Sequence, residues 1–164
     1  MSKVITLDLF DSASIKRAAD NLNRIAKNFK ELDKKILEEV CSSGAETCRE
    51  QIIMHGATDS GELYDSVGYE VTDDVGHIYA NATHAKFVEY GTGVVGNGTY
   101  PNGIPWAYDI HGHGEDGWVY YKKGSFHWTQ GQASRPFMYD TAKELKNEGL
   151  SKAVKKVIER ELQK

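Results

Sequence analysis

The fold is decided by the stretch SIKRAADNLNRIAKNFKELDKKILEEV, residues 14–40. Its apolar residues recur every three or four positions, at Ile15, Ala18, Leu22, Ile25, Phe29, Leu32, Ile36 and Val40. This spacing is typical of one apolar stripe along a helix. The stripe continues through Cys48 and Ile52 and contains no proline. We therefore expect helix over residues 12–55, either as one long helix or as two helices broken near residues 42–44, where weak helix formers meet.

Short β-like segments surround this helix. Residues 1–10 are rich in β-forming side chains and predict a short strand. Residues 62–135 form the predicted β region, in which Val67, Tyr69 and Val71 share a face that pairs with Ile78 and Ala80 across a turn at Asp73–Asp74. A third strand is predicted over residues 85–90. Pro136 can open a last helix over residues 136–163, with Gly149 as a candidate break. The pattern predicts an α+β fold in a single domain, residues 1–164, with a central antiparallel sheet.

A long insertion interrupts the β region. Ten of the 16 glycines lie between Gly91 and Gly131, and the pattern predicts a flexible loop at about residues 94–117. A loop of this length in a compact domain is usually functional or mobile. Because aromatic side chains carry much of the energy of protein interfaces, we expect Trp106, Tyr108 and Trp118 to form an interface. Two strands on either side of Lys122-Lys123-Gly124 predict a hairpin after this loop.

The charge is unevenly distributed. The chain has 164 residues and a formal net charge of −4. Residues 55–121 contain ten acidic side chains and one basic one, Lys86, while the two ends are neutral or mildly basic. The overall acidity argues against a dedicated nucleic-acid binder, which usually has a basic face. No apolar run reaches the length of a membrane span, and two cysteines do not make a disulfide scaffold.

Few residues have the spacing of a catalytic or metal site. His111 and His113 alternate on a glycine-rich segment near Glu115, which makes them weak metal-ligand candidates. The Gly-x-Gly-x-x-Gly pattern at residues 91–96 lacks the strand–helix context of a dinucleotide site. Cys48 lies within a helix, away from any nucleophile loop. The sequence predicts no enzyme and no cofactor.

Three motifs occur in order along the chain: DSGELYDSV at residues 59–67, HAKFVEYGTG at residues 84–93 and WTQGQASRPFM at residues 128–138. Together they resemble the HK97 gp10-like family of tailed bacteriophages and prophages, over about residues 40–147. The sequence departs from the family pattern before the first motif, where Gly56-Ala57-Thr58 stands in place of a common proline, and at Ser60, where threonine is commoner. The segment between residues 94 and 125 is also long for the family.

The resemblance implies a structural role. Members are tail components, or tail completion and head–tail joining proteins, so the implied partners are further copies in a ring, expected to be a hexamer, and connector, neck, tail-tube or terminator proteins. DNA would be passing cargo, no membrane would be involved, and no reaction would be catalysed. The implied location is the virion neck or tail, and the bacterial host cytoplasm before assembly.

The motif residues suit fold-forming roles. Gly61 allows a sharp turn, Leu63 can anchor that turn in the core, and Pro136-Phe137 can start a helix and bury a ring. The full set of predicted fold-motif residues is Gly61, Leu63, Ser66, Glu89, Tyr90, Gly91, Thr92, Pro136 and Phe137.

In a ring, the acidic middle of the chain could line the channel, where carboxylates repel the phosphates of DNA and allow it to pass without binding. The predicted channel residues are Glu70, Asp73, Asp74 and Asp109, with Asp65, Glu115 and Asp116 as further candidates. A solvated sheet face explains the same residues. Two other functions stay open at this point: a metal-dependent phage enzyme that uses His111 and His113, and a monomeric prophage factor that binds a host protein.

Overall fold

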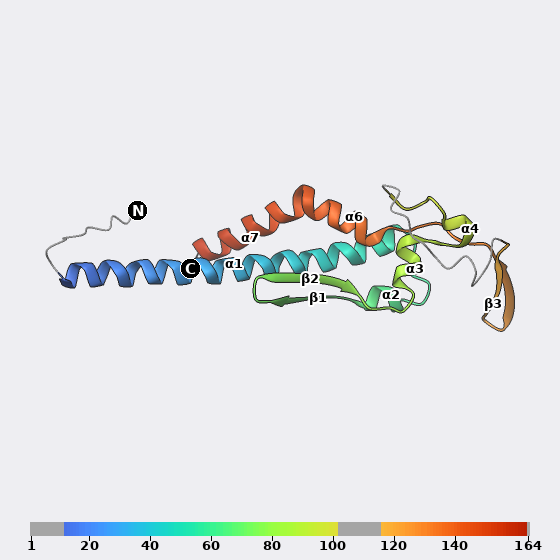
Figure 1. Cartoon of the computed structure of the whole chain (residues 1–164), viewed down its shortest axis with the longest axis horizontal. Helices are drawn as coiled ribbons and strands as arrows, with labels where there is room; N and C mark the ends of the chain where they lie inside the picture. The colour runs from blue at the N-terminus through green and yellow to red at the C-terminus, as the bar shows by residue number, and fades with distance from the viewer. Residues whose placement is uncertain (1–11, 102–115, 164) are drawn as a thin grey trace.

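A computed structural model describes residues 12–101 and 116–163 of the chain. The predicted strand at residues 1–10 lies outside this range. Figure 1 shows an elongated molecule built along one helix, with a hairpin against one side of that helix and the C-terminal helices against the other. The fold class, α+β with a long N-terminal helix, antiparallel strands and a C-terminal helix, is confirmed.

Helix α1 runs without a break over Ser12–Met54. The unbroken alternative is therefore the correct one at residues 42–44. Gly44 lies where α1 is pressed between Ile78 and Leu145, and a Cβ at this glycine would overlap both side chains. Glycine at this position permits close packing of three elements and does not interrupt the helix.

The first hairpin consists of β1 (Val67–Thr72) and β2 (Val75–Ala80). Its register pairs Val67 with Ala80 and Tyr69 with Ile78, as the alternation predicts. The turn at Asp73 has a positive φ of 53°, a conformation that aspartate tolerates better than most residues. Before this hairpin, Gly61 (φ 80°) precedes the short helix α2 (Glu62–Asp65), and Leu63 of α2 is buried.

The prediction of a third strand at residues 85–90 is wrong. These residues form α3 (Ala85–Tyr90), and α4 (Gly93–Gly96) follows within the predicted loop. The helical turn buries both Val88 and Glu89, adjacent residues that a strand would direct to opposite faces. The described strands consequently form two separate two-stranded sheets and not one central sheet.

The second hairpin consists of β3 (Trp118–Lys122) and β4 (Ser125–Thr129), joined through Lys123 and Gly124 at positive φ. The short β5 (Gly131–Gln132) follows and bridges Thr92 and Gly93. Figure 1 places the second hairpin at one end of the molecule and the start of α1 at the other.

The C-terminal segment is continuous helix. It comprises α6 (Phe137–Glu144), the π-helical η2 (Leu145–Gly149) and α7 (Leu150–Leu162). The predicted break at Gly149 is absent, since the chain passes this point through a widened turn. Pro136 is the residue before the helix and not its first residue. Contacts along α1 hold both α6 and α7.

The core lies where the second half of α1 meets the first hairpin and α6. Phe137, Ile52 and Cys48 are its most completely buried large side chains, together with Leu63 and Val157. The large side chains of the apolar stripe of α1 are buried in this way only in its second half, although the small Ala18 in the first half is 7 % exposed. The first half continues beyond α7 (Figure 1), and four of its side chains are exposed: Ile15, Leu22, Ile25 and Phe29.

Candidate functional site

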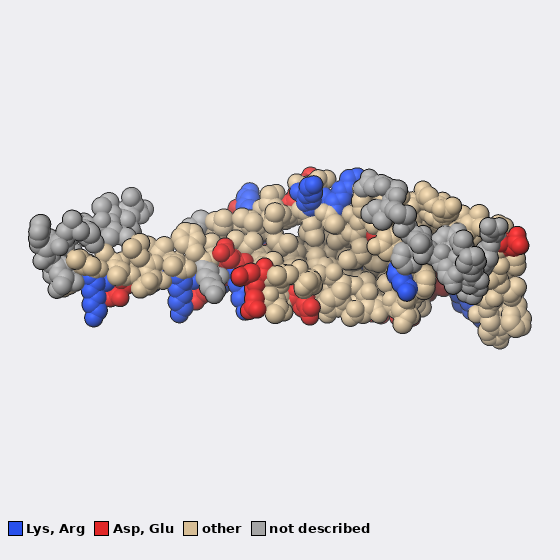
Figure 2. All heavy atoms as spheres, viewed as in Figure 1, with Lys and Arg blue, Asp and Glu red and all other residues tan. Residues whose placement is uncertain are grey.

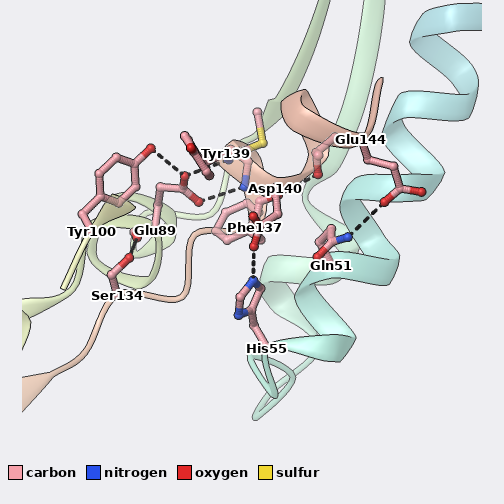
Figure 3. A network of polar contacts seen from close by, with 11 residues as sticks. Gln51, His55, Glu89, Tyr100, Ser134, Phe137, Tyr139, Asp140 and Glu144 are labelled. Atoms are coloured by element: carbon pink, nitrogen blue, oxygen red, sulfur yellow. Dashed lines mark hydrogen bonds and ion pairs between the residues drawn. The ribbon is translucent and has the colours of Figure 1, made fainter. Parts of the chain in front are cut away.

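A buried carboxylate organises the junction between α3 and α6. The Glu89 side chain is only 5 % exposed. Its Oε2 accepts a hydrogen bond from the Met138 amide at 2.9 Å, and its Oε1 accepts one from the Tyr139 amide at 3.0 Å. These amides belong to the first turn of α6, where backbone N–H groups have no helical partner. Glu89 therefore caps a helix that begins almost 50 residues later in the chain (Figure 3).

Burial and hydrogen bonding act in opposite directions on this carboxylate. Loss of solvent raises the pKa of Glu89, and the hydrogen bonds from Met138, Tyr139 and Tyr100 offset only part of that effect. The Tyr100 hydroxyl donates to Glu89 Oε1 at 3.2 Å, and burial together with the Glu89 charge raises the pKa of Tyr100. The role that these contacts give the Glu89 side chain is to support the start of α6.

Further hydrogen bonds attach the segment before α6 to α3 and α4. Ser134 Oγ donates to the Glu89 carbonyl at 2.5 Å, and the Arg135 amide donates to the Val88 carbonyl at 2.9 Å. The Gln132 amide donates to Thr92 Oγ1 at 3.2 Å. The second and third sequence motifs are thus two sides of one joint. The end of α1 reaches the same helix, since His55 Nε2 lies 2.9 Å from Asp140 Oδ2 and Gln51 donates to Glu144 (Figure 3).

The joint fixes the position of the second hairpin. Gly93 (φ 62°) and Gly131 (φ 106°) lie so close to the opposite backbone that a Cβ on either would overlap a carbonyl oxygen. On the other side, the Lys122 ammonium pairs with the Asp59 carboxylate, which lowers the pKa of Asp59. An open cavity of about 620 Å³ lies between hairpin and body, lined in part by His84, Lys122 and Arg135.

One face of this hairpin is apolar and exposed. The register pairs Val119 with Trp128 and Tyr121 with Phe126, and alternation places all four side chains on one face. They are between 57 and 77 % exposed. The rings of Tyr121 and Phe126 pack edge-to-face across the strands, with centroids 5.2 Å apart. We call these four residues the aromatic face. Exposed aromatic side chains in such a cluster are the usual anchors of protein interfaces.

The predicted interface residues are distributed differently. Trp118 is half-buried and lies on the other face of the hairpin, toward which Tyr120 and His127 also point. Trp106 and Tyr108 lie outside the described residues. The sequence reasoning missed the aromatic face, although the alternation of Val119, Tyr121, Phe126 and Trp128 across a two-residue turn could have identified it.

Three of the predicted acidic residues, Glu70, Asp73 and Asp74, belong to the first hairpin and its turn. Asp65 ends α2, Glu70 lies within β1, and both are exposed, as are the turn residues Asp73 and Asp74 and the more distant Asp116. Figure 2 shows acidic atoms gathered near the tip of the first hairpin and basic atoms spaced along the start of α1. Asp73 and Asp74 line a notch of about 720 Å³ together with Lys27, Glu31 and Lys34. Asp109 and Glu115 lie outside the described residues.

No three His, Cys, Asp or Glu side chains within residues 12–101 and 116–163 are arranged to hold a metal ion. His111 and His113 lie outside that range. Burial raises the pKa of Cys48 to about 11, so its thiol is not ionised at neutral pH. Among the helices of the described part of the chain, none combines the length and the apolar character of a membrane span.

Residues 16–91 match the family model described as "Bacteriophage HK97-gp10, putative tail-component". This is an HK97 gp10-like region. The family resemblance inferred from the motifs is confirmed for these residues, which are similar to a putative phage tail component. The match includes most of α1, the first hairpin and α3, but it ends before the third motif. Glu89 nevertheless joins the matched region to that motif through its hydrogen bonds to α6. No curated protein and no solved structure matches the chain.

Proposed function

We propose that this protein is a non-catalytic structural component of the virion that completes the tail or joins it to the head. The observation that carries the proposal is the exposed aromatic face on the second hairpin, which the ion pair between Lys122 and Asp59 links to the body. Four large apolar side chains on one exposed surface are typical of a surface that is covered in an assembly. The match to the tail-component family over residues 16–91 supports the same role.

The proposed assembly is a ring around the DNA passage, with neck, connector or tail-tube proteins above and below it. Rings of identical subunits require a contact between two different surfaces of the same chain. The chain offers two such surfaces at its opposite ends, the aromatic face and the exposed apolar stripe of α1. The chain would reside in the host cytoplasm before assembly and in the virion afterwards.

Loss of the protein from a phage provides the direct test. We expect a phage or prophage that lacks this gene to accumulate filled heads and separate tails, visible by electron microscopy, and to regain joined particles when the gene is supplied in trans. A variant gene encoding Met54→Ser is the matched control, because Met54 is an exposed apolar residue outside both surfaces. Normal numbers of infectious particles without the protein would overturn the proposal.

The DNA passage is proposed to be bordered by Asp65 and Glu70. Asp73 and Asp74 contribute less, because the basic side chains of α1 across the notch offset their charge. We expect the assembled variant with Asp65→Lys and Glu70→Lys to bind double-stranded DNA in a salt-dependent manner, whereas the wild type does not. Glu159→Lys on the exposed surface of α7 is the control. Equal DNA binding by both variants would contradict the placement of these carboxylates at the passage.

A further inference from the structure

The first half of α1 presents an apolar stripe whose four large side chains are exposed, while the small Ala18 between them is 7 % exposed. Ile15, Leu22, Ile25 and Phe29 are between 39 and 61 % exposed, although the same stripe is half-buried at Leu32 and Ile36. The contrast follows the position of α7, which packs on the later part of α1 and leaves its beginning projecting (Figure 1). We call the four exposed side chains the α1 stripe.

The residues beside the α1 stripe are uncharged. Together with Ala18, its members are separated alternately by three and four positions along the chain. This is the spacing of a helix seam that packs against a partner helix. The flanking positions that border such a seam hold Ala19, Asn21, Ala26 and Asn28. The basic residues of this half of the helix fall on its outer side, where Figure 2 shows them spaced along one edge. A partner can therefore approach the α1 stripe without burying a charge.

We propose that the aromatic face of one subunit packs on the α1 stripe of a second copy of the same chain. This inference rests on the proposed ring and names its subunit contact. The two surfaces lie at opposite ends of the molecule (Figure 1), so a single repeated contact between them covers both. A contact between two aromatic faces would leave both α1 stripes exposed. A contact between two α1 stripes would leave both aromatic faces exposed.

The dimensions of the two surfaces agree. A five-residue strand spans about 17 Å, and the 14 steps from Ile15 to Phe29 span about 21 Å of helix. Each surface is formed by four large apolar side chains. Their exposed areas together amount to roughly 1,000 Å², which reaches the lower limit for a specific interface. Because this is the lower limit, a single contact is weak, and closure of a ring supplies the remaining stability through repetition.

Two variants that each lack one surface test the contact. The first carries Phe126→Ser and Trp128→Ser in the aromatic face, and the second carries Leu22→Ser and Phe29→Ser in the α1 stripe. All four residues are exposed, so circular dichroism and thermal unfolding should match those of the wild type. Analytical ultracentrifugation then measures the mass of each chain alone and of the equimolar mixture, with Met54→Ser as the matched control.

The inferred contact predicts a distinctive pattern of masses. The wild type and the Met54→Ser control form assemblies larger than two chains, whereas each variant alone sediments as one chain of 18.3 kDa. The mixture forms a complex of two chains and no larger one, because the intact aromatic face of the second variant meets the intact stripe of the first and no further surfaces remain.

Several outcomes would overturn the inference. Dimers of either variant alone would indicate a contact between like surfaces. A wild type that stays a single chain at every concentration, together with a mixture that does not pair, would assign both surfaces to other tail proteins or to residues 1–11 of the same chain. The proposed function fails separately, since normal particles formed without the protein would contradict it whatever masses these variants show.

Discussion

Two phenylalanines show how the middle of the molecule differs from its ends. Phe137, the first residue of α6, is 1 % exposed and belongs to the same core cluster as Leu63 and Val88. Phe126 is 77 % exposed on a hairpin outside that core. The body buries a cluster of apolar side chains and satisfies its buried carboxylate internally, whereas the ends leave comparable side chains in water. The difference supports the proposal that the two ends form the contacts of an assembly.

Substitution of the two phenylalanines gives the largest expected difference. Phe137→Ala should lower the free energy of unfolding by about 4 kcal/mol, because it removes a fully buried ring and leaves a cavity. Phe126→Ala should change it by less than about 0.5 kcal/mol, as for an ordinary surface substitution. Urea unfolding of the monomeric chain measures both values. Similar losses for the two variants would show that the aromatic face is part of the folded core.

Removal of the Glu89 carboxylate tests the joint between α3 and α6. We expect Glu89→Ala to cost about 3 kcal/mol of stability, because two helix amides and the Tyr100 hydroxyl lose their acceptor in a buried site. Glu89→Gln keeps one acceptor oxygen and the volume of the side chain, so it should cost about half as much. The same unfolding experiment compares them, and a neutral effect of Glu89→Ala would contradict the role of Glu89 as a cap.

Alanine substitutions at Gly93 and Gly98 distinguish the cost of a steric overlap from the cost of an unfavourable backbone conformation. Gly93 and Gly98 both have positive φ, 62° and 72°, but a Cβ at Gly93 would overlap the Gln130 carbonyl while one at Gly98 meets open space. Gly98→Ala should therefore cost about 1 kcal/mol for its backbone conformation alone. Gly93→Ala should cost at least about 2 kcal/mol. Equal costs would indicate that the bridge between β5 and α4 is loose in solution.

The joint also predicts the sign of a pH dependence. The pKa of Glu89 is raised in the folded protein, so its contribution to stability is complete below the ordinary value near 4.5 and decreases as pH rises through the folded-state pKa. The stability of the wild type minus that of Glu89→Gln should therefore be greatest in acid. This stability difference decreases by about 1.4 kcal/mol for each pH unit that separates the ordinary pKa of the glutamate from its pKa in the folded protein. A difference that grows with pH would show that the hydrogen bonds outweigh burial.

The parts of the fold with a regular pattern could be predicted from the sequence. The stripe of α1 and the pairing of Val67 with Ala80 follow from periodicity alone. The segment at residues 85–90 could not, because its six residues fit a strand equally well and the distant amides that hydrogen-bond to Glu89 leave no signal within the segment. A break near residues 42–44 was one of two alternatives and Gly149 was a candidate break, but neither glycine interrupts its helix. At Gly44 the neighbouring Ile78 and Leu145 explain the glycine.

The candidate site was predicted less completely than the fold. Glu89 and Phe137 were identified within motifs, but only the three-dimensional structure reveals that they belong to the same joint. Aromatic enrichment directs attention to the second half of the chain, but composition does not distinguish the half-buried Trp118 from the exposed Trp128. The projection of α1 beyond α7 has no local signal, because the stripe has the same spacing where it is covered and where it is exposed.

Hydroxyl-radical footprinting of the chain, free in solution and within purified phage particles, tests the contrast between body and ends most directly. Oxidation is measured by mass spectrometry at each side chain. We expect Phe126, Trp128 and Phe29 to become protected in the particle, while Met54, also 77 % exposed in the free chain, stays reactive. Absence of the chain from the particles, or equal reactivity of both ends in the two states, would contradict this expectation.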